Sequence, residues 1–258
     1  MIPISDDNPT MRTPIVTIAI LLGMGAVWVF AEGAGLDARR LAMVVCKYGL
    51  LPGELTGRAV VGTGIPMGNG MPRCLVDREP INYLTPLTSM FLHGGWGHIL
   101  GNGLFLWIFG NNIEDSMGRG RFLVFYLLCG LGAATAQVLI NPASPVPMVG
   151  ASGAIAGVLG AYLILYPRVK VNVLFIFIIF FKVFKVPAWA MLLWWFGLQV
   201  LSGLPELSSV RPDVSSGVAV WAHIGGFLTG AVLIKFFEDR SLVGERTVLR
   251  HRRYPTEP

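Results

Sequence analysis

The chain has 258 residues, of which 53% are hydrophobic and only 14% are charged, and its mean hydropathy is +0.63. In a typical soluble domain about a quarter of the residues are charged. These values exclude a disordered chain and argue against a soluble enzyme, because so few charges could not cover a folded protein of 28.0 kDa. The composition therefore predicts a membrane protein.

Charged residues are absent from five long stretches, each of which can hold a spanning helix of about 20 residues. The longest stretch, 122–167, contains three prolines between Asn141 and Pro147, which indicates two helices joined by a loop. The predicted fold is an all-α polytopic membrane protein, a single domain over residues 1–258 with six transmembrane helices. In chain order, the predicted helices cover about 14–31, 88–112, 121–140, 149–166, 187–204 and 218–237.

The connections between these helices are of unequal length. Residues 32–87 are predicted to form a long outer loop, and residues 238–258 a basic cytoplasmic tail. The apolar stretch 171–181 is too short to span a membrane and is flanked by basic residues, which favours an interfacial or re-entrant segment. A seven-span model that uses this stretch is the alternative. Cys46 and Cys74 both lie in the outer loop, where they could form a disulfide.

Basic residues indicate the orientation, because short connections rich in Lys and Arg tend to remain in the cytoplasm. In the six-span model most of them fall on one side, which predicts that both termini are cytoplasmic. The expected localisation is that of a multi-pass protein of a bacterial inner membrane. The exception is the outer loop, whose length weakens the rule. The net charge of +5 and the pI near 9.3 are assigned to orientation and to anionic membrane lipid, not to nucleic acid, because the basic residues form no separate domain.

Polar side chains at membrane depth are costly, so the few that occur are candidates for function. His98 and Asn102 are four residues apart and therefore share one helix face. Ser152 lies just inside the fourth predicted helix, and His223 lies near the start of the sixth. The second, fourth and sixth helices run in the same direction in this topology, so the four side chains are predicted at one level near the outer surface.

Small residues follow both Ser152 and His223 along their helices, at positions that allow close helix packing: Gly153, Ala156, Gly157, Gly160, Gly226 and Gly230. Close packing is what a hydroxyl needs to reach an imidazole on another helix, at about 2.6 to 3.2 Å. Each feature alone has a structural explanation, because glycines pack helices and a serine often bonds its own backbone.

Together the four polar residues predict nucleophilic catalysis by a dyad. His223 would take the proton of Ser152, which attacks a carbonyl, while His98 and Asn102 donate to the developing oxyanion. No acidic residue lies in a predicted span to complete a triad, so packing is expected to orient His223. The G-x-S-x-G motif fails because position 154 is Ala154, and the H-E-x-x-H pattern is absent. Neither a metal nor another cofactor is expected.

These residues resemble the rhomboid family of intramembrane serine proteases. The resemblance covers most of the chain from Leu84 to Glu238 and rests on four blocks, namely His93–Asn102, Glu114–Phe122, Gly150–Gly153 and Ala222–Gly230. It implies a six-helix core with the same nucleophile, base and oxyanion donors, and a structural role for His93. Many relatives carry an aromatic residue where this chain has Ala156, so another group must hold the ring of His223.

By resemblance, the substrates are single-span or polytopic membrane proteins that are cleaved near the outer membrane face and enter beside the fifth helix. The first loop of some relatives has a Trp-Arg pair where this chain has Asn82 and Tyr83. The alternative function is that of a catalytically silent rhomboid-like protein, which binds membrane clients for quality control or trafficking. Such proteins usually lack the serine or the histidine, and this chain has both.

Overall fold

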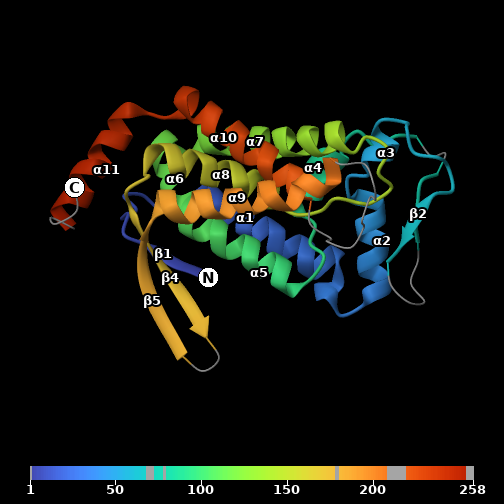
Figure 1. Cartoon of the computed structure of the whole chain (residues 1–258), viewed down its shortest axis with the longest axis horizontal. Helices are drawn as coiled ribbons and strands as arrows, with labels where there is room; N and C mark the ends of the chain where they lie inside the picture. The colour runs from blue at the N-terminus through green and yellow to red at the C-terminus, as the bar shows by residue number, and fades with distance from the viewer. Residues whose placement is uncertain (1, 68–72, 78–79, 178–179, 208–218, 254–258) are drawn as a thin grey trace.

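The computed structural model describes residues 2–67, 73–77, 80–177, 180–207 and 219–253. Its helices run mostly along one long axis, with the C-terminal helix and a β-hairpin towards one end and the connection 32–87 at the other (Figure 1). Helical segments lie near all six predicted ranges: α1 (Ile15–Ala26) with the π-helical turn η1 (Val27–Ala31), α5 (Trp96–Phe105) with η4 (Leu106–Gly110) and α6 (Asn111–Met117), α7 (Arg119–Ile140), α8 (Ser152–Leu165), α9 (Ala188–Leu207) and α10 (Val220–Phe237).

Three of these helices are long and apolar enough to cross a membrane: α7, the part of α9 over Ala188–Pro205, and α10. Two further apolar helices among the described residues, Ile15–Ala31 and Ser152–Leu165, are shorter. The helical character of a membrane protein is thus confirmed, whereas the count of six spans stays a prediction. Residues 208–218, which connect α9 to α10, lie outside the described residues.

The second helix differs from its predicted range of 88–112. Residues 85–91 form the short helix α4 (Thr85–Thr88) and the turn η3 (Ser89–Phe91), and α5 begins only at Trp96. The intervening turn is tied to the end of the first helix, because the backbone N–H of His93 donates to Glu32 Oε1 at 2.8 Å. The helical path then continues to Met117. It ends at Gly118, whose φ of 83° is a left-handed conformation that favours glycine.

The all-α class is wrong in one region. Strands β4 (Lys170–Phe177) and β5 (Phe180–Pro187) form an antiparallel hairpin, and β1 (Ile2–Asp6) pairs with β4 to give a sheet of order β1-β4-β5. The stretch 171–181 is rich in β-branched and aromatic residues, which pack well on a pleated strand. It therefore forms strands in its described residues, and the seven-span alternative is wrong. Residues 178–179 lie outside the described part.

The outer connection 32–87 is more ordered than the predicted loop. It contains α2 (Ala38–Tyr48), α3 (Pro52–Leu55) and the strand pair β2 (Gly64–Pro66) and β3 (Arg73–Leu75). A disulfide between Cys46 and Cys74 joins α2 to β3. The bridge between Leu50 and Met148 then ties this region to the segment that precedes α8. The tail likewise forms a helix, α11 (Arg240–Arg253), and residues 254–258 lie outside the described part.

Candidate active site

The site is built on the contact between α8 and α10, which glycines bring together. A Cβ atom added to Gly226 would lie 1.9 Å from the carbonyl oxygen of Gly153, and one added to Gly230 would lie 1.9 Å from that of Gly157. No side chain fits such spaces, so the two backbones are in direct contact. Gly160 makes the same kind of approach to the carbonyl oxygen of Phe227, at 2.1 Å.

This close packing brings Ser152 and His223 together. Ser152 is the first residue of α8, and His223 lies in the first turn of α10. The distance between His223 Nε2 and Ser152 Oγ is 2.8 Å, which is hydrogen-bond distance. Both side chains are only partly buried, so they combine a fixed geometry with access from the cavity beside them.

A third side chain, not predicted from the sequence, orients His223. Gln199 on α9 places its Oε1 atom 2.9 Å from His223 Nδ1. An amide oxygen only accepts hydrogen bonds, so this contact assigns the ring proton to Nδ1 and leaves the Nε2 lone pair free for the Ser152 hydroxyl. The expectation that packing alone holds the ring is therefore incomplete.

Packing also helps to orient the ring of His223, through an aromatic residue on the same helix as Gln199. Trp195 lies four residues before Gln199, so both share one face of α9, and its ring centroid is 5.8 Å from that of His223. It supplies the aromatic contact that Ala156 cannot. Gln199 is a strongly polar residue among apolar neighbours in α9, as His98 is in α5, but its contact with His223 depends on how α9 packs.

His98 and Asn102 face the turn that leads into α8. Gly150 has a φ of 121°, and a Cβ atom added there would lie 2.6 Å from His98 Nε2 and 3.6 Å from Asn102 Nδ2. The backbone N–H of Gly94 donates to His98 Nδ1 at 3.3 Å, which leaves Nε2 as the N–H donor of a neutral ring. Asn102 Nδ2 is buried without a hydrogen-bond partner in the described part of the chain. Two donors thus point at one space beside Gly150.

His93 packs behind this pair. Its side chain is fully buried, and its ring centroid is 5.1 Å from that of His98 in an edge-to-face arrangement. Burial lowers the pKa of His93 to about 4, with a smaller contribution from the neighbouring His98. Burial likewise raises the pKa of Glu32 to about 7, partly offset by the hydrogen bond that its carboxylate accepts from the His93 backbone. His93 therefore stays neutral near pH 7 and supports His98 by packing.

All four predicted residues line one cavity of about 690 Å³. Its wall also includes Trp195 and the small residues Gly94, Gly101, Gly150, Ala156 and Ala222. The first backbone N–H groups of α8, near Ser152, have no partner inside the helix and add donors at the same place. Among the described residues there is no group of three or more His, Cys, Asp or Glu side chains that could hold a metal ion.

Comparison with known proteins gives the family. The Rhomboid domain model matches residues 81–239, which is more than half of the chain. Among curated proteins, the chain is 46% identical to Rhomboid protease GluP of Bacillus subtilis over 77 residues, which are 30% of this chain and 15% of that protein.

Further similarities extend to plant and yeast proteins. The chain is 39% identical to Rhomboid-like protein 11, chloroplastic, of Arabidopsis thaliana, over 28% of this chain and 25% of that protein. It is 29% identical to Rhomboid protein 1, mitochondrial, of Saccharomyces cerevisiae, over 61% of this chain and 42% of that protein. The chain thus spans less than half the length of each of these relatives.

Proposed function

Since this chain belongs to the rhomboid family, we propose that it is an intramembrane serine endopeptidase that cleaves transmembrane proteins with a Ser152–His223 dyad. The observation that carries this proposal is the distance of 2.8 Å between His223 Nε2 and Ser152 Oγ, at the wall of a cavity of about 690 Å³. The similarity to a protein named as a rhomboid protease supports the same activity.

The proposed reaction begins when Nε2 of His223 accepts the Ser152 proton as Oγ attacks the scissile carbonyl. Gln199 Oε1 accepts the Nδ1–H bond and stabilises the positive ring that forms. The negative charge that develops on the carbonyl oxygen is then held by His98 Nε2–H, Asn102 Nδ2–H and the first N–H groups of α8. The protonated ring then gives its proton to the leaving amine. In the second half of the reaction His223 takes a proton from the water that attacks the acyl-enzyme, and the ring returns this proton to Ser152 Oγ.

The proposed topology has six spans with both termini in the cytoplasm of a bacterial cell. It places the dyad a few residues inside the outer ends of α8 and α10, where water can reach it. A substrate helix must unwind to present its backbone to Ser152, so we expect substrates with a small residue before the scissile bond and a helix-weakening residue nearby. Efficient cleavage of stable poly-leucine helices would count against this.

The test is cleavage of a rhomboid reporter substrate by the purified protein in liposomes. Wild type is compared with Ser152→Ala and His223→Ala at equal folded yield, and both variants are expected to lose at least about 10³-fold in kcat. Labelling of Ser152 by a fluorophosphonate probe reports the activated nucleophile without any substrate. If folded wild type neither cleaves nor reacts with the probe, the protein is a catalytically silent client-binding member of the family.

A further inference from the structure

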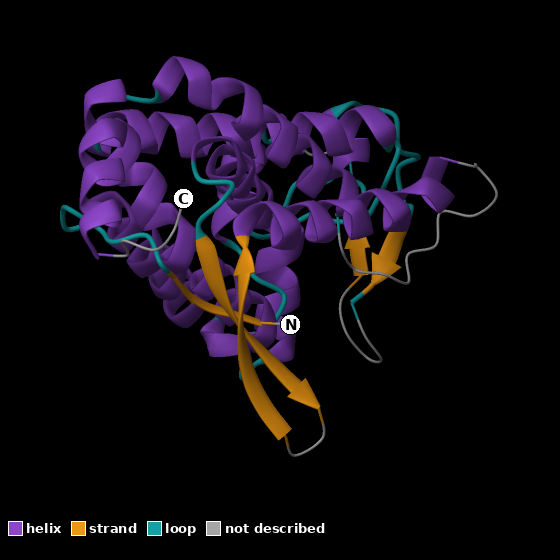
Figure 2. Cartoon of the chain, turned by 60° about the vertical axis from the view of Figure 1, so that its left-hand side comes forward, coloured by secondary structure: helices purple, strands orange, loops and turns teal. Residues whose placement is uncertain are grey.

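The β4–β5 hairpin carries apolar side chains that nothing in the bundle covers. It projects beyond the helices in two different views (Figures 1 and 2). Its large hydrophobic side chains are between 42% and 68% exposed: Phe175, Ile176, Phe181, Val183 and Phe184. Hydrophobic surface of this extent on a single element marks a contact with a membrane or with another protein.

The exposed groups lie on both faces of the hairpin. Phe175 is opposite Lys182 in the register, whereas the next pair is Ile176 with Phe181, and successive pairs point to opposite faces. One protein partner would cover one face and leave the other in water. A hairpin that is apolar on both faces is better accommodated where lipid surrounds it.

The backbone restricts how deeply the hairpin can enter lipid. In the described part of the sheet β5 pairs only with β4, and β1 reaches β4 only over residues 171–174, so both edges of the outer half lack a strand partner. Open edges are not tolerated in the hydrocarbon core, where their N–H and C=O groups would have no partner. The hairpin therefore fits the boundary between headgroups and acyl chains, where water satisfies these groups.

The charges of the hairpin itself are all basic. No Asp or Glu occurs between residues 116 and 205, whereas Arg168 precedes the hairpin and Lys170, Lys182 and Lys185 lie within it. Only at the root does an acidic group approach, where Asp7 forms an ion pair with Lys185 at 2.7 Å. The Lys182 ammonium lies 5.0 Å from the ring centroid of Phe184, so a cation and an aromatic ring are presented side by side. Aromatic and basic residues together are typical of segments at the interface of an anionic membrane.

A hollow of about 340 Å³ lies at the root of the hairpin. It is lined by Arg168 and Arg250, which come from different elements, and by the apolar surfaces of Leu165, Tyr166 and Pro167. No carboxylate in the described part of the chain lies within ion-pair distance of either arginine. Two guanidinium groups beside an apolar wall match a phosphate that carries an acyl chain.

We propose that the β4–β5 hairpin and this hollow form a binding surface for anionic phospholipid. The phosphate would lie between Arg168 and Arg250, while Phe175, Phe181 and Phe184 contact the upper part of the acyl chains. The hollow is at the C-terminal end of α8, about 20 Å along the helix from Ser152. The surface is thus separate from the dyad, and its test does not depend on the proposed protease activity.

The first experiment measures retention of phosphatidylglycerol and phosphatidylcholine by native mass spectrometry, with the full chain in the Ser152→Ala background. We expect selective retention of phosphatidylglycerol and an at least fivefold loss in the double variant Arg168→Gln/Arg250→Gln. The matched control Arg119→Gln/Arg121→Gln removes two exposed charges outside the hollow and should retain the lipid. An equal loss in both double variants would overturn the site, since it would reflect net charge alone. Competition with inorganic phosphate distinguishes a lipid headgroup from free phosphate as the ligand. Displacement of the lipid by an equal concentration of inorganic phosphate would assign the hollow to free phosphate.

The second experiment places an environment-sensitive fluorophore on Phe181→Cys. The label is selective because Cys46 and Cys74 are paired and Cys129 is buried. In vesicles with phosphatidylglycerol we expect quenching by lipids that carry a nitroxide near the headgroup, at least twofold stronger than by an aqueous quencher. Stronger quenching from water would overturn the proposal. Self-quenching that increases with protein density would overturn it as well, because it would indicate that the open edge of β5 pairs with a second copy of the chain.

Discussion

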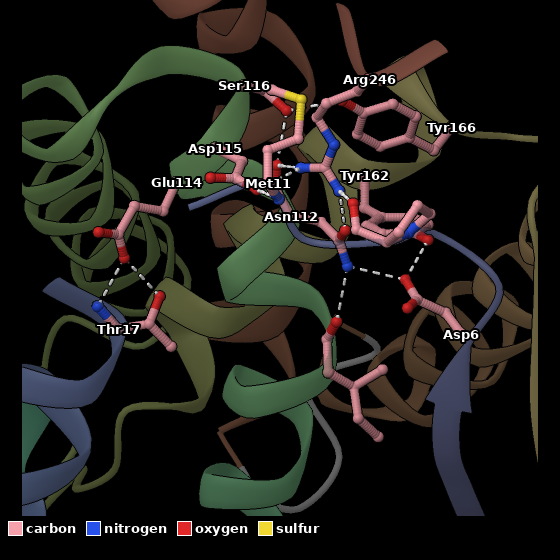
Figure 3. Close-up of polar contacts among 12 residues, drawn as sticks. Asp6, Met11, Thr17, Asn112, Glu114, Asp115, Ser116, Tyr162, Tyr166 and Arg246 are labelled. Carbon is pink, nitrogen blue, oxygen red and sulfur yellow. Dashed lines mark hydrogen bonds and ion pairs between the residues drawn. The ribbon is translucent and has the colours of Figure 1, made fainter. Parts of the chain in front are cut away.

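Two clusters of buried polar groups lie at opposite ends of the bundle and are organised differently. At the end with the hairpin, residues distant in sequence bond to one another (Figure 3). Arg246 of α11 donates to the backbone and side-chain oxygens of Asn112, lies 3.7 Å from Asp115 and stacks on the ring of Tyr166. At the other end, Asn102 Nδ2 is buried with no partner in the described residues, beside the space at Gly150.

The difference is between side chains that bond across the fold and a donor that lines a cavity. Burial of an unpaired donor costs about 1–3 kcal/mol, and a donor that lines a cavity can be satisfied by a bound ligand. Arg246 bonds to groups of the same chain through both terminal nitrogens, although its Nε atom has no partner in the described residues, and it joins the N-terminal segment, α6 and α11. Asn102 lines the same cavity as Ser152, so under the proposed function its donor would bond to the substrate. Substitutions at the two ends should accordingly affect different measurements.

The largest effect on stability is expected for Arg246→Ala. The variant leaves Asp115 buried without its cation and the side-chain oxygen of Asn112 without its donor, which typically costs about 3–5 kcal/mol. Unfolding in detergent should shift by this amount relative to wild type. Arg253→Ala removes an exposed arginine of the same helix and should change stability by less than about 0.5 kcal/mol. Equal stability of both variants would show that the cluster does not hold the fold.

The next effect is on activity alone. Asn102→Ala removes a donor that bonds to nothing in the described part of the free protein, so stability should change little. Loss of one oxyanion donor reduces kcat about 10²–10³-fold. Reporter cleavage and thermal unfolding, measured on the same preparation, separate the two consequences. A large drop in Tm with a normal kcat would assign Asn102 to the structural class.

Sequence patterns predict the Asn102 end well, because a polar residue in an apolar helix stands out and the periodicity gives its face. Ser152, His223, His98 and Asn102 were all selected in this way, and the structure brings them to one cavity. Gln199 was missed because its role depends on the rotation of α9 about its axis, which no local pattern specifies. The predicted start of the second helix was wrong because the turn at His93 is fixed by a hydrogen bond to Glu32, which is 61 residues away in the sequence.

The hairpin end was harder to predict, since its contacts join the two ends of the chain. In the sequence Arg246 is one of many basic residues of the predicted tail, yet in the structure its side chain is only 1% exposed. The strand character of 171–181 also depends on pairing, because a short apolar run is equally compatible with a buried helix until its partner is known. Hydropathy gives the depth of a segment but not its partners.

A smaller effect on activity is expected for Gln199→Leu. The substitution keeps the volume on α9 but removes the acceptor 2.9 Å from His223 Nδ1, so either nitrogen can carry the ring proton. Loss of one hydrogen bond of about 1 kcal/mol should reduce kcat roughly fivefold and leave KM unchanged. Gln199→Glu keeps an acceptor at this position and should retain more activity than Gln199→Leu. Equal activity of wild type and both variants would mean that Trp195 packing alone orients the ring.

The smallest effect concerns Asp6 of β1, which lies beside the Arg246 cluster. Burial raises the pKa of Asp6 from 3.8 to about 7, partly offset by the hydrogen bond that its carboxylate accepts from Tyr162. The folded state therefore keeps this proton at pH values where the unfolded chain has released it, so stability falls as the pH rises from about 4 to about 7. Asp6→Asn keeps one oxygen that can accept from Asn112 and Tyr162, and it removes the titration. Wild type should lose about 1 kcal/mol between pH 6 and pH 7 relative to this variant.

Thermal unfolding of both proteins across pH 5 to 8 measures that difference. Burial also raises the pKa of Glu32 to about 7, which gives a slope of the same sign, but Glu32 is present in both proteins and cancels in the comparison. Parallel curves would mean that water reaches the Asp6 carboxylate and that it is ionised in the fold. The cluster would then be open to solvent on the side of β1. Asp6 would be in contact with water, and the buried part of the cluster would end at Arg246.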